Sequence, residues 1–220
     1  MLRFVALFGL SGALALTASC SNAPAEGRAA APDGTLRNVQ GNVFTSSSQG
    51  QAALATATDG RTALVWESKR QERGTFGVYA RLFDRAGQPL SHEFHVNTHL
   101  PRAQWHPAAA FSDDNTLWFA WESFSQDGSG SGLVARAFDQ EGQPLSAELP
   151  INLQREGDQV DVALVAAAEG GALAVWASHH PDSSFHAANG IRARLMHASD
   201  LGTVEIVMST QEGAQDRRPS

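Results

Sequence analysis

The residues best suited to chemistry lie in a loop that follows a recurring WES or WAS motif. Its three versions differ, because KRQERGT is basic, SQDGSGS offers Asp127 beside flexible glycines, and the third gathers His179, His180, Asp182 and His186. Asp127 and nearby carbonyls suit a calcium ion, although a hairpin turn explains the same residues without one. A transition metal needs three or more converging ligands, whereas adjacent histidines on an extended chain point to opposite sides. We therefore treat these as candidate ligand-binding loops.

Five tryptophans divide into two groups. Trp66, Trp121 and Trp176 recur at an interval of 55 residues, which is typical of structural core positions, with a sugar-stacking platform as the alternative. Trp105 and Trp118 lie outside that recurrence. They are therefore the better candidates for exposed contact with a ligand.

Three arginines, Arg81, Arg136 and Arg194, also occupy related positions. A guanidinium fork matches a carboxylate, so an anion-binding cluster is one interpretation. The simpler one is framework pairing or cation–π packing, because each arginine shares a strand face with an aromatic residue or methionine. The acidic residues available as partners are Glu67, Glu122, Asp84 and Asp139.

No catalytic constellation is visible. A glycosidase needs two carboxylates across a cleft, and Glu67, Glu122, Asp113 and Asp114 are explained by repeat equivalence or by turn position. Nucleophile elbows, HExxH and phosphate loops are absent from the sequence. We predict a protein that is not an enzyme and has no cofactor other than the calcium considered at Asp127.

These residues sit on an internal repeat of 55 residues that needs no gap between its first two copies. The repeats cover about 42–97, 98–152 and 153–210, within a blade-like region of 42–216, and 211–220 reads as the start of a further, truncated repeat. The third copy has a longer first loop and lacks the GQP turn. The chain therefore predicts tandem copies of one structural unit.

Each repeat contains four short runs suited to strands, separated by turn sequences such as DGRT and RAGQP. In the third run Val78, Ala80 and Leu82 alternate with Tyr79, Arg81 and Phe83, so one face is small and apolar. Four antiparallel strands in about 50 residues, repeated in tandem, are typical of propeller blades. The predicted fold class is all-β, with three propeller-like blades.

The stretch FAWESFSQDGSGSGLVARAFDQEGQPLSAELPIN resembles blade-like repeats of bacterial surface and secreted proteins. That resemblance covers roughly residues 42–216 and implies a fold, not a reaction. The same loop is loosely similar to the Asp-box hairpin of sialidase-type propellers, which carries Ser, Asp and Gly at alternate positions. Ser125 and Asp127 fit that pattern but Ser129 departs from it, so no sialidase activity is implied.

The N-terminus is typical of a secretory signal, with Arg3, an apolar run over 4–16 and small residues before Cys20. The run is shorter than the ~20 residues of a membrane-spanning helix. TASC resembles the lipobox of bacterial lipoproteins, with Thr17 where leucine is usual. The resemblance implies a signal peptide over 1–19 and a lipid on Cys20, with Ser21 favouring the outer membrane. A plain cleavable signal with a free Cys20 is the alternative.

Residues 20–41 are rich in Ala, Pro, Gly and Ser and predict a flexible tether behind that anchor. The rest of the composition is that of a globular chain, with 42% hydrophobic residues and a single cysteine that excludes an internal disulfide. A net charge of −7 without basic clusters argues against nucleic acid as a partner.

Three blades are fewer than the four to eight of closed propellers. A partial reading frame, a homodimer that completes a six-bladed ring, and an open stack of sheets all fit that number. The leading hypothesis is a non-catalytic, lipid-anchored protein of the bacterial cell envelope whose loops bind a glycan or a protein. The alternatives are a glycan-active propeller enzyme and a purely structural surface protein.

Overall fold

The computed structural model describes residues 2–5, 18–20, 38–71, 75–179, 190–198 and 205–210. Every element in these residues is a β-strand, which confirms the predicted all-β class. Three antiparallel sheets of four strands follow one another along the chain. Within the described part, no helix is both long and apolar enough to cross a membrane.

Each four-stranded sheet is formed by one repeat, and its strands are adjacent in chain order. The first sheet contains β4 (Gln49–Thr56), β5 (Thr62–Lys69), β6 (Phe76–Phe83) and β7 (Phe94–His95). The second contains β8 (Gln104–Phe111), β9 (Leu117–Phe124), β10 (Ser131–Phe138) and β11 (Leu149–Pro150). The third contains β12 (Asp158–Ala166), β13 (Ala172–His179), β14 (Gly190–Met196) and β15 (Glu205–Thr210).

A small N-terminal sheet pairs β1 (Leu2–Val5) with β2 (Ala18–Cys20) on one side and β3 (Asn38–Gln40) on the other. Most of the predicted signal peptide, most of the tether and the whole of 211–220 lie outside the described residues. Backbone pairing of β1 and β2 does not test cleavage or acylation. The signal peptide and the lipid anchor therefore stay predictions.

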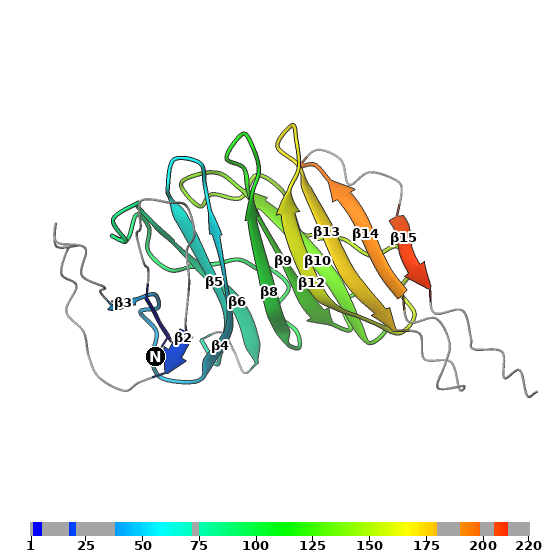
Figure 1. Cartoon of the computed structure of the whole chain (residues 1–220). Coiled ribbons are helices and arrows are strands. Elements are labelled where there is room, and N and C mark those ends of the chain that lie inside the picture. The colour runs from blue at the N-terminus through cyan, green and yellow to red at the C-terminus, as the bar shows by residue number, and fades with distance from the viewer. Residues whose placement is uncertain are drawn as a thin grey trace, which may run out of the picture.

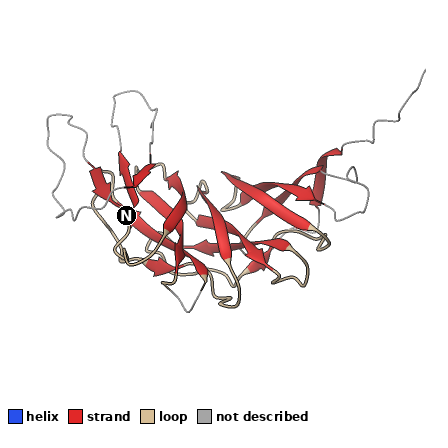
Figure 2. Ribbon diagram, turned by 90° about the horizontal axis from the view of Figure 1, so that it is seen from below, coloured by secondary structure: helices blue, strands red, loops and turns tan. Residues whose placement is uncertain are grey.

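The three sheets lie side by side in a row, and the views in Figures 1 and 2 agree on this order. The first strand of each repeat contacts the first strand of the next, so β4, β8 and β12 are neighbours across the sheets. We call the end of the sheets that carries the 70–75 and 125–130 connections the loop end. The opposite end, with the tight turns at 57–61 and 139–143, is the turn end.

Burial between the sheets follows the predicted alternation of small and large faces. The small face of the first sheet, including Val65, Val78 and Ala80, packs on Phe119 and Trp121 of the second. The second sheet repeats this against the third, where Leu133 and other small-face residues meet Trp176 and Met196. The first interface therefore places small residues against an aromatic face, whereas the second also contains the large Trp118 from the second sheet.

The small face of the third sheet is exposed in a single chain. Val165, Ile191 and Leu195 on this sheet are 54%, 41% and 44% exposed, whereas Leu133, the equivalent of Ile191, is 1% exposed. The predicted ring-completing homodimer is not tested by a single chain and stays a prediction. In the single chain, the small face of the second sheet is therefore covered by the third sheet, whereas the small face of the third sheet is uncovered.

The recurring GQP turns at the turn end are closed by aspartate. Asp84 Oδ1 accepts hydrogen bonds from the backbone N–H groups of Ala86 and Gln88, at 2.9 and 2.7 Å. Asp139 does the same in the second repeat. Gly142 in that turn has φ +82°, and a Cβ there would lie 2.9 Å from a ring carbon of Phe94, so backbone conformation and close packing both require glycine.

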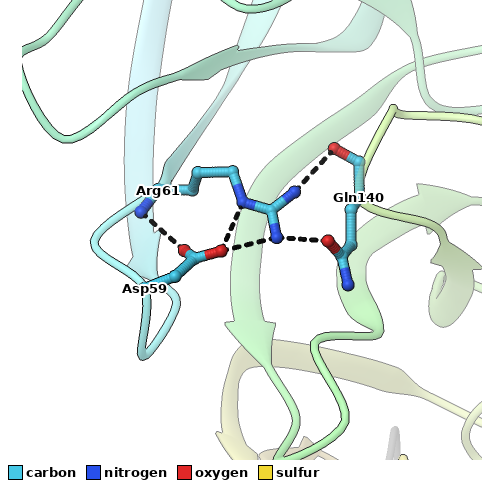
Figure 3. A network of polar contacts seen from close by, with 3 residues as sticks. All are labelled: Asp59, Arg61 and Gln140. Atoms are coloured by element: carbon cyan, nitrogen blue, oxygen red, sulfur yellow. Dashed lines mark hydrogen bonds and ion pairs between the residues drawn. The ribbon is translucent and has the colours of Figure 1, made fainter.

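Neighbouring sheets are also joined at the turn end by polar contacts. Arg61 in the first turn pairs with Asp59 at 2.6 Å and also donates to the side chain and backbone carbonyl of Gln140 in the second repeat (Figure 3). Between the second and third sheets, Asp113 Oδ1 accepts from Gly170 N–H at 3.1 Å. These contacts hold the turn ends of adjacent sheets together.

The predicted structural residues lie inside this framework. Trp66, Trp121 and Trp176 are fully or almost fully buried. The Nε1 groups of Trp121 and Trp176 donate to the buried amides of Gln104 and Gln159, at 3.0 and 3.2 Å. In the second and third repeats, a glutamine at the start of the first strand thus satisfies the buried indole, whereas Trp66 Nε1 in the first repeat has no such partner among the described residues.

The three arginines bond to backbone carbonyls rather than to the acidic partners considered from sequence. Arg81 donates to Ser91 and Gly41, Arg136 to Ser146 and Val96, and Arg194 to Pro150 and Ile151. Arg81 and Arg136 also stack over Phe83 and Phe138, with guanidinium carbons 5.6 and 5.2 Å from the ring centroids. The arginines therefore join each blade to the linker that leads into it.

Candidate functional site

The first strand of each repeat has a β-bulge near its start, at the loop end. The pairing of β4, β8 and β12 with their neighbours shifts register between Gly50 and Ala53, Trp105 and Ala108, and Val160 and Ala163. One residue in each bulge has a left-handed backbone, namely Gln51, His106 and Asp161, with φ of 45°, 45° and 57°. A bulge turns its side chain out of the regular alternation, and bulges are often found beside functional sites.

Carboxylates from the second strands reach these bulges on the next sheet. Glu67 of β5 accepts a hydrogen bond from the backbone N–H of His106, with Oε2 at 3.3 Å. Glu122 of β9 accepts one from the backbone N–H of Asp161, with Oε1 at 3.0 Å. The same Oε1 lies 2.9 Å from His106 Nδ1. These four residues, which we call the loop-end cluster, form a continuous polar connection across all three sheets.

Burial differs within the loop-end cluster. Glu122 is 2% exposed and Asp161 is exposed, while the His106 side chain is 46% exposed. Burial raises the pKa of Glu67 above its ordinary 4.5, and the Glu122 charge acts in the same direction, against the lowering effects of the His106 N–H and charge. Glu67 therefore holds a proton more readily than a solvated glutamate does.

Aromatic side chains border the cluster. The ring of Trp105, which is partly exposed, lies 6.2 Å from that of His106 and 6.3 Å from that of Phe124. Phe124 is 37% exposed, and the guanidinium carbon of Arg102 lies 5.7 Å from its ring centroid. An apolar ring face beside hydrogen-bonding carboxylates suits a ligand with both C–H faces and hydroxyl groups.

The two tryptophans predicted to contact a ligand have different surroundings. Trp105 borders the loop-end cluster, as described. The prediction of an exposed Trp118 is wrong, because this residue is fully buried and its Nε1 donates to the Gly170 carbonyl at 3.0 Å. Trp118 fills the interface between the second and third sheets, where the equivalent position of the first repeat is the small Ala63.

Asp127 lies in the 125–130 loop and is part of its turn. Its Oδ1 accepts from Ser129 N–H at 3.2 Å and its Oδ2 from Asn152 Nδ2 at 3.2 Å. It lines a pocket of about 210 Å³ with Glu148 and Arg155. No group of three or more His, Cys, Asp or Glu side chains in the described part is arranged to hold a metal ion. Calcium at Asp127 is not tested and stays a prediction.

The histidine-rich loop falls largely outside the described residues, which include His179 but not His180, Asp182 or His186. His179 is the last residue of β13, is exposed, and pairs across the sheet with Asp158. The structure therefore places one end of this loop at the loop end, on the third sheet.

Sequence reasoning missed His106 and Asp161. A signal was present, since each is the polar residue two positions after the recurring glutamine, Gln104 or Gln159. The sequence predicts a framework role for Glu67 and Glu122. In the structure both do support the framework, because each holds a bulge, but they also bring carboxylates to one place.

Comparisons with known proteins show a likeness of fold to several solved structures. No protein-family model and no curated protein matches the chain. Among solved structures, the Hadza microbial sialidase Hz136 shares 13% identity with a TM-score of 0.51, covering 74% of this chain and 37% of that one. The endo-arabinase from Bacteroides thetaiotaomicron VPI-5482 shares 11% with a TM-score of 0.52, covering 81% and 69%.

A protein of unknown function from Dyadobacter fermentans DSM 18053 gives 13% identity and a TM-score of 0.50, covering 77% of this chain and 56% of that one. The chain thus spans from about a third to about two thirds of these proteins. At such low identity the likeness is one of fold alone. It supports the assignment of three four-stranded sheets of the β-propeller type.

Proposed function

We propose that the protein is a non-catalytic glycan-binding module of the bacterial cell envelope, and that saccharide binds at the loop-end cluster. The observation that carries the proposal is the continuous connection of Glu67, His106, Glu122 and Asp161 across three sheets, bordered by Trp105. Carboxylates accept hydrogen bonds from sugar hydroxyls, and an indole face covers the C–H face of a sugar ring. The solved sialidase and arabinase of similar fold are named for action on glycans, which supports the same ligand class.

A saccharide panel tests this proposal on the full chain. Immobilised protein is loaded with oligosaccharides, and retained members are measured by frontal affinity chromatography. Trp105→Ala is expected to weaken retention about tenfold, or about 1.4 kcal/mol, because the stacking surface is removed. Arg61→Ala, at the turn end, is the control and should leave retention unchanged. Equal retention of saccharide by the Trp105 and Arg61 variants would mean that the saccharide does not bind at the loop-end cluster.

The second candidate is a glycan-active enzyme, and one observation favours it. Glu67 and Glu122 are close enough for the charge of one to affect the other, and burial raises the pKa of Glu67. Glycosidases use two carboxyl groups whose environments hold their pKa values apart. Release of reducing ends from any retained oligosaccharide, lost in Glu67→Gln and in Glu122→Gln, would replace the binding proposal with this one.

Anchoring is proposed from the N-terminal sequence, in which TASC ends at the single cysteine, Cys20. Mass spectrometry of the protein expressed in a bacterium should find residues 1–19 removed and a diacylglyceryl group on Cys20. Cys20→Ala should abolish both changes. An unmodified Cys20 after cleavage would leave a secreted protein without a lipid anchor.

A further inference from the structure

The charges gathered at the loop-end cluster limit what the cluster can accept. Three of its four residues, Glu67, Glu122 and Asp161, carry carboxyl groups, and the fourth is His106. Within the described part, the arginines of the blade framework bond to linker carbonyls and do not reach these carboxylates. Arg102, the cation placed beside the aromatic border, stacks on Phe124. The loop-end cluster therefore carries an excess of acidic groups.

Unused hydrogen-bonding capacity remains on the two glutamates. Glu122 accepts through Oε1 and Glu67 through Oε2, and neither second oxygen has a hydrogen bond from any described residue. A carboxylate oxygen without a hydrogen-bond donor readily accepts a hydrogen bond from a hydroxyl group. A ligand carboxylate brings no such donor, and it would also be repelled by like charges in surroundings that are partly desolvated.

We infer that the loop-end cluster selects neutral saccharide residues and rejects carboxylated ones, such as uronic and sialic acids. The inference rests on the proposed function and narrows its ligand class. Specificity arises from two effects: hydroxyl groups of a neutral sugar satisfy Glu67 and Glu122, while the negative charge of the exposed Asp161, whose N–H bonds to Glu122, opposes an acidic sugar. Trp105 can stack on the C–H face of either ligand type.

Ligand pairs that differ by a carboxylated residue, or by esterification of the carboxyl group alone, test this inference. Full-length protein is titrated at pH 7.5 with lactose against sialyllactose, and with methyl-esterified against free oligogalacturonides, alongside a wider neutral panel. We expect neutral members to bind at least about tenfold more tightly than their acidic counterparts. Acidic members that bind as tightly as neutral ones would overturn the inference and leave glycan binding intact. If no saccharide binds, the proposed function fails, and the inference fails with it.

A matched charge removal sharpens the test. Asp161→Asn neutralises an exposed side chain while its backbone N–H still donates to Glu122, so the fold should be retained. The preference for neutral over acidic ligands should narrow at least threefold in this variant. Glu141→Gln removes the same charge from the exposed turn at the turn end and should leave the preference unchanged. Equal narrowing in both variants would mean that overall charge, and not the cluster, sets the preference.

Discussion

The second and third sheets are built on the same repeat but differ at the positions that matter most. Both bury their strand tryptophan and bond it to the recurring glutamine. The second sheet places Glu122 directly after that tryptophan, whereas the third has Ala177 there. The small face of the second sheet is covered and that of the third is exposed. The repeat therefore specifies the blade, while the residue after the tryptophan and the presence of a neighbouring sheet differ between the copies.

The largest expected effect compares the covered face with the exposed one. Leu133→Asp places a charge in the interface between the second and third sheets, where the side chain is 1% exposed, and should cost more than ~4 kcal/mol of unfolding free energy. Ile191→Asp changes the equivalent residue of the third sheet, which is 41% exposed, and should cost less than ~1 kcal/mol. Urea unfolding of both variants measures the contrast, and equal losses would mean that the third face is covered in solution.

A second comparison concerns Glu122 and Ala177. Glu122→Ala leaves the Asp161 N–H and the His106 ring without their acceptor, and should reduce the free energy of unfolding by about 1–3 kcal/mol. Ala177→Gly at the equivalent position of the third sheet removes no hydrogen bond and should cost no more than about 1 kcal/mol. Thermal unfolding of both variants is the measurement. A Glu122 variant as stable as the wild type would mean that the hydrogen bonds of Glu122 do not stabilise the bulge.

Two half-buried glutamates should respond to pH in opposite directions. Burial raises the pKa of Glu67, so its contribution to stability is greatest below pH 4.5 and is lost as pH rises through the raised value. Burial alone would also raise the pKa of Glu148, but hydrogen bonds from Thr98, His99 and Gln126 hold it below 4.5. Its contribution is present above pH 4.5 and is lost as pH falls toward that lower value.

Unfolding curves collected between about pH 3 and pH 7 test this pair. Ionisation of Glu67 should lower the stability of the wild type as pH rises, and Glu67→Gln should abolish this decrease. Ionisation of Glu148 should raise the stability of the wild type as pH rises, and Glu148→Gln should abolish this increase. The two differences from wild type therefore carry opposite signs. Curves that change in the same direction for both variants would contradict the assigned environments.

The smallest expected effect is at the turn end. Arg61→Ala breaks the contacts with Asp59 and Gln140 shown in Figure 3, but the ion pair is partly exposed, with the Arg61 and Asp59 side chains 22% and 43% exposed. Exposed ion pairs add little to stability, so the melting temperature should change by less than about 2 °C. Calorimetry checks this value. A large drop would show that sheet-to-sheet attachment depends on the turn end more than on the apolar interfaces.

Much of the fold was predictable because it depends on local, repeated patterns. The alternation of Val78, Ala80 and Leu82 with larger residues defined both faces of a blade, and the GQP turns marked the strand ends. Trp118 was mispredicted since its equivalents are small or aliphatic, and only the packing of two sheets shows the space that it fills. Repetition identifies framework residues well, but it cannot show how a departure from the repeat is accommodated.

The loop-end cluster was less predictable than the blades. A bulge depends on the register of two strands and on the sheet beside them, so the sequence marks the position of His106 and Asp161, two residues after a recurring glutamine, but not their left-handed backbones. Glu67 and Glu122 each accept a hydrogen bond from the next sheet, and Glu122 also contacts His106 in its own sheet. Contacts between sheets become visible only when the sheets are assembled.

Hydrogen–deuterium exchange with and without a saturating, retained neutral oligosaccharide is the most direct test of glycan binding at the loop-end cluster. Protection should concentrate in peptides that contain the bulges of β8 and β12, because ligand contact with Glu67 and Glu122 would steady the N–H groups of His106 and Asp161. The turn at 139–143 should show no change. Protection confined to that turn, or absent from both bulges, would contradict the proposal.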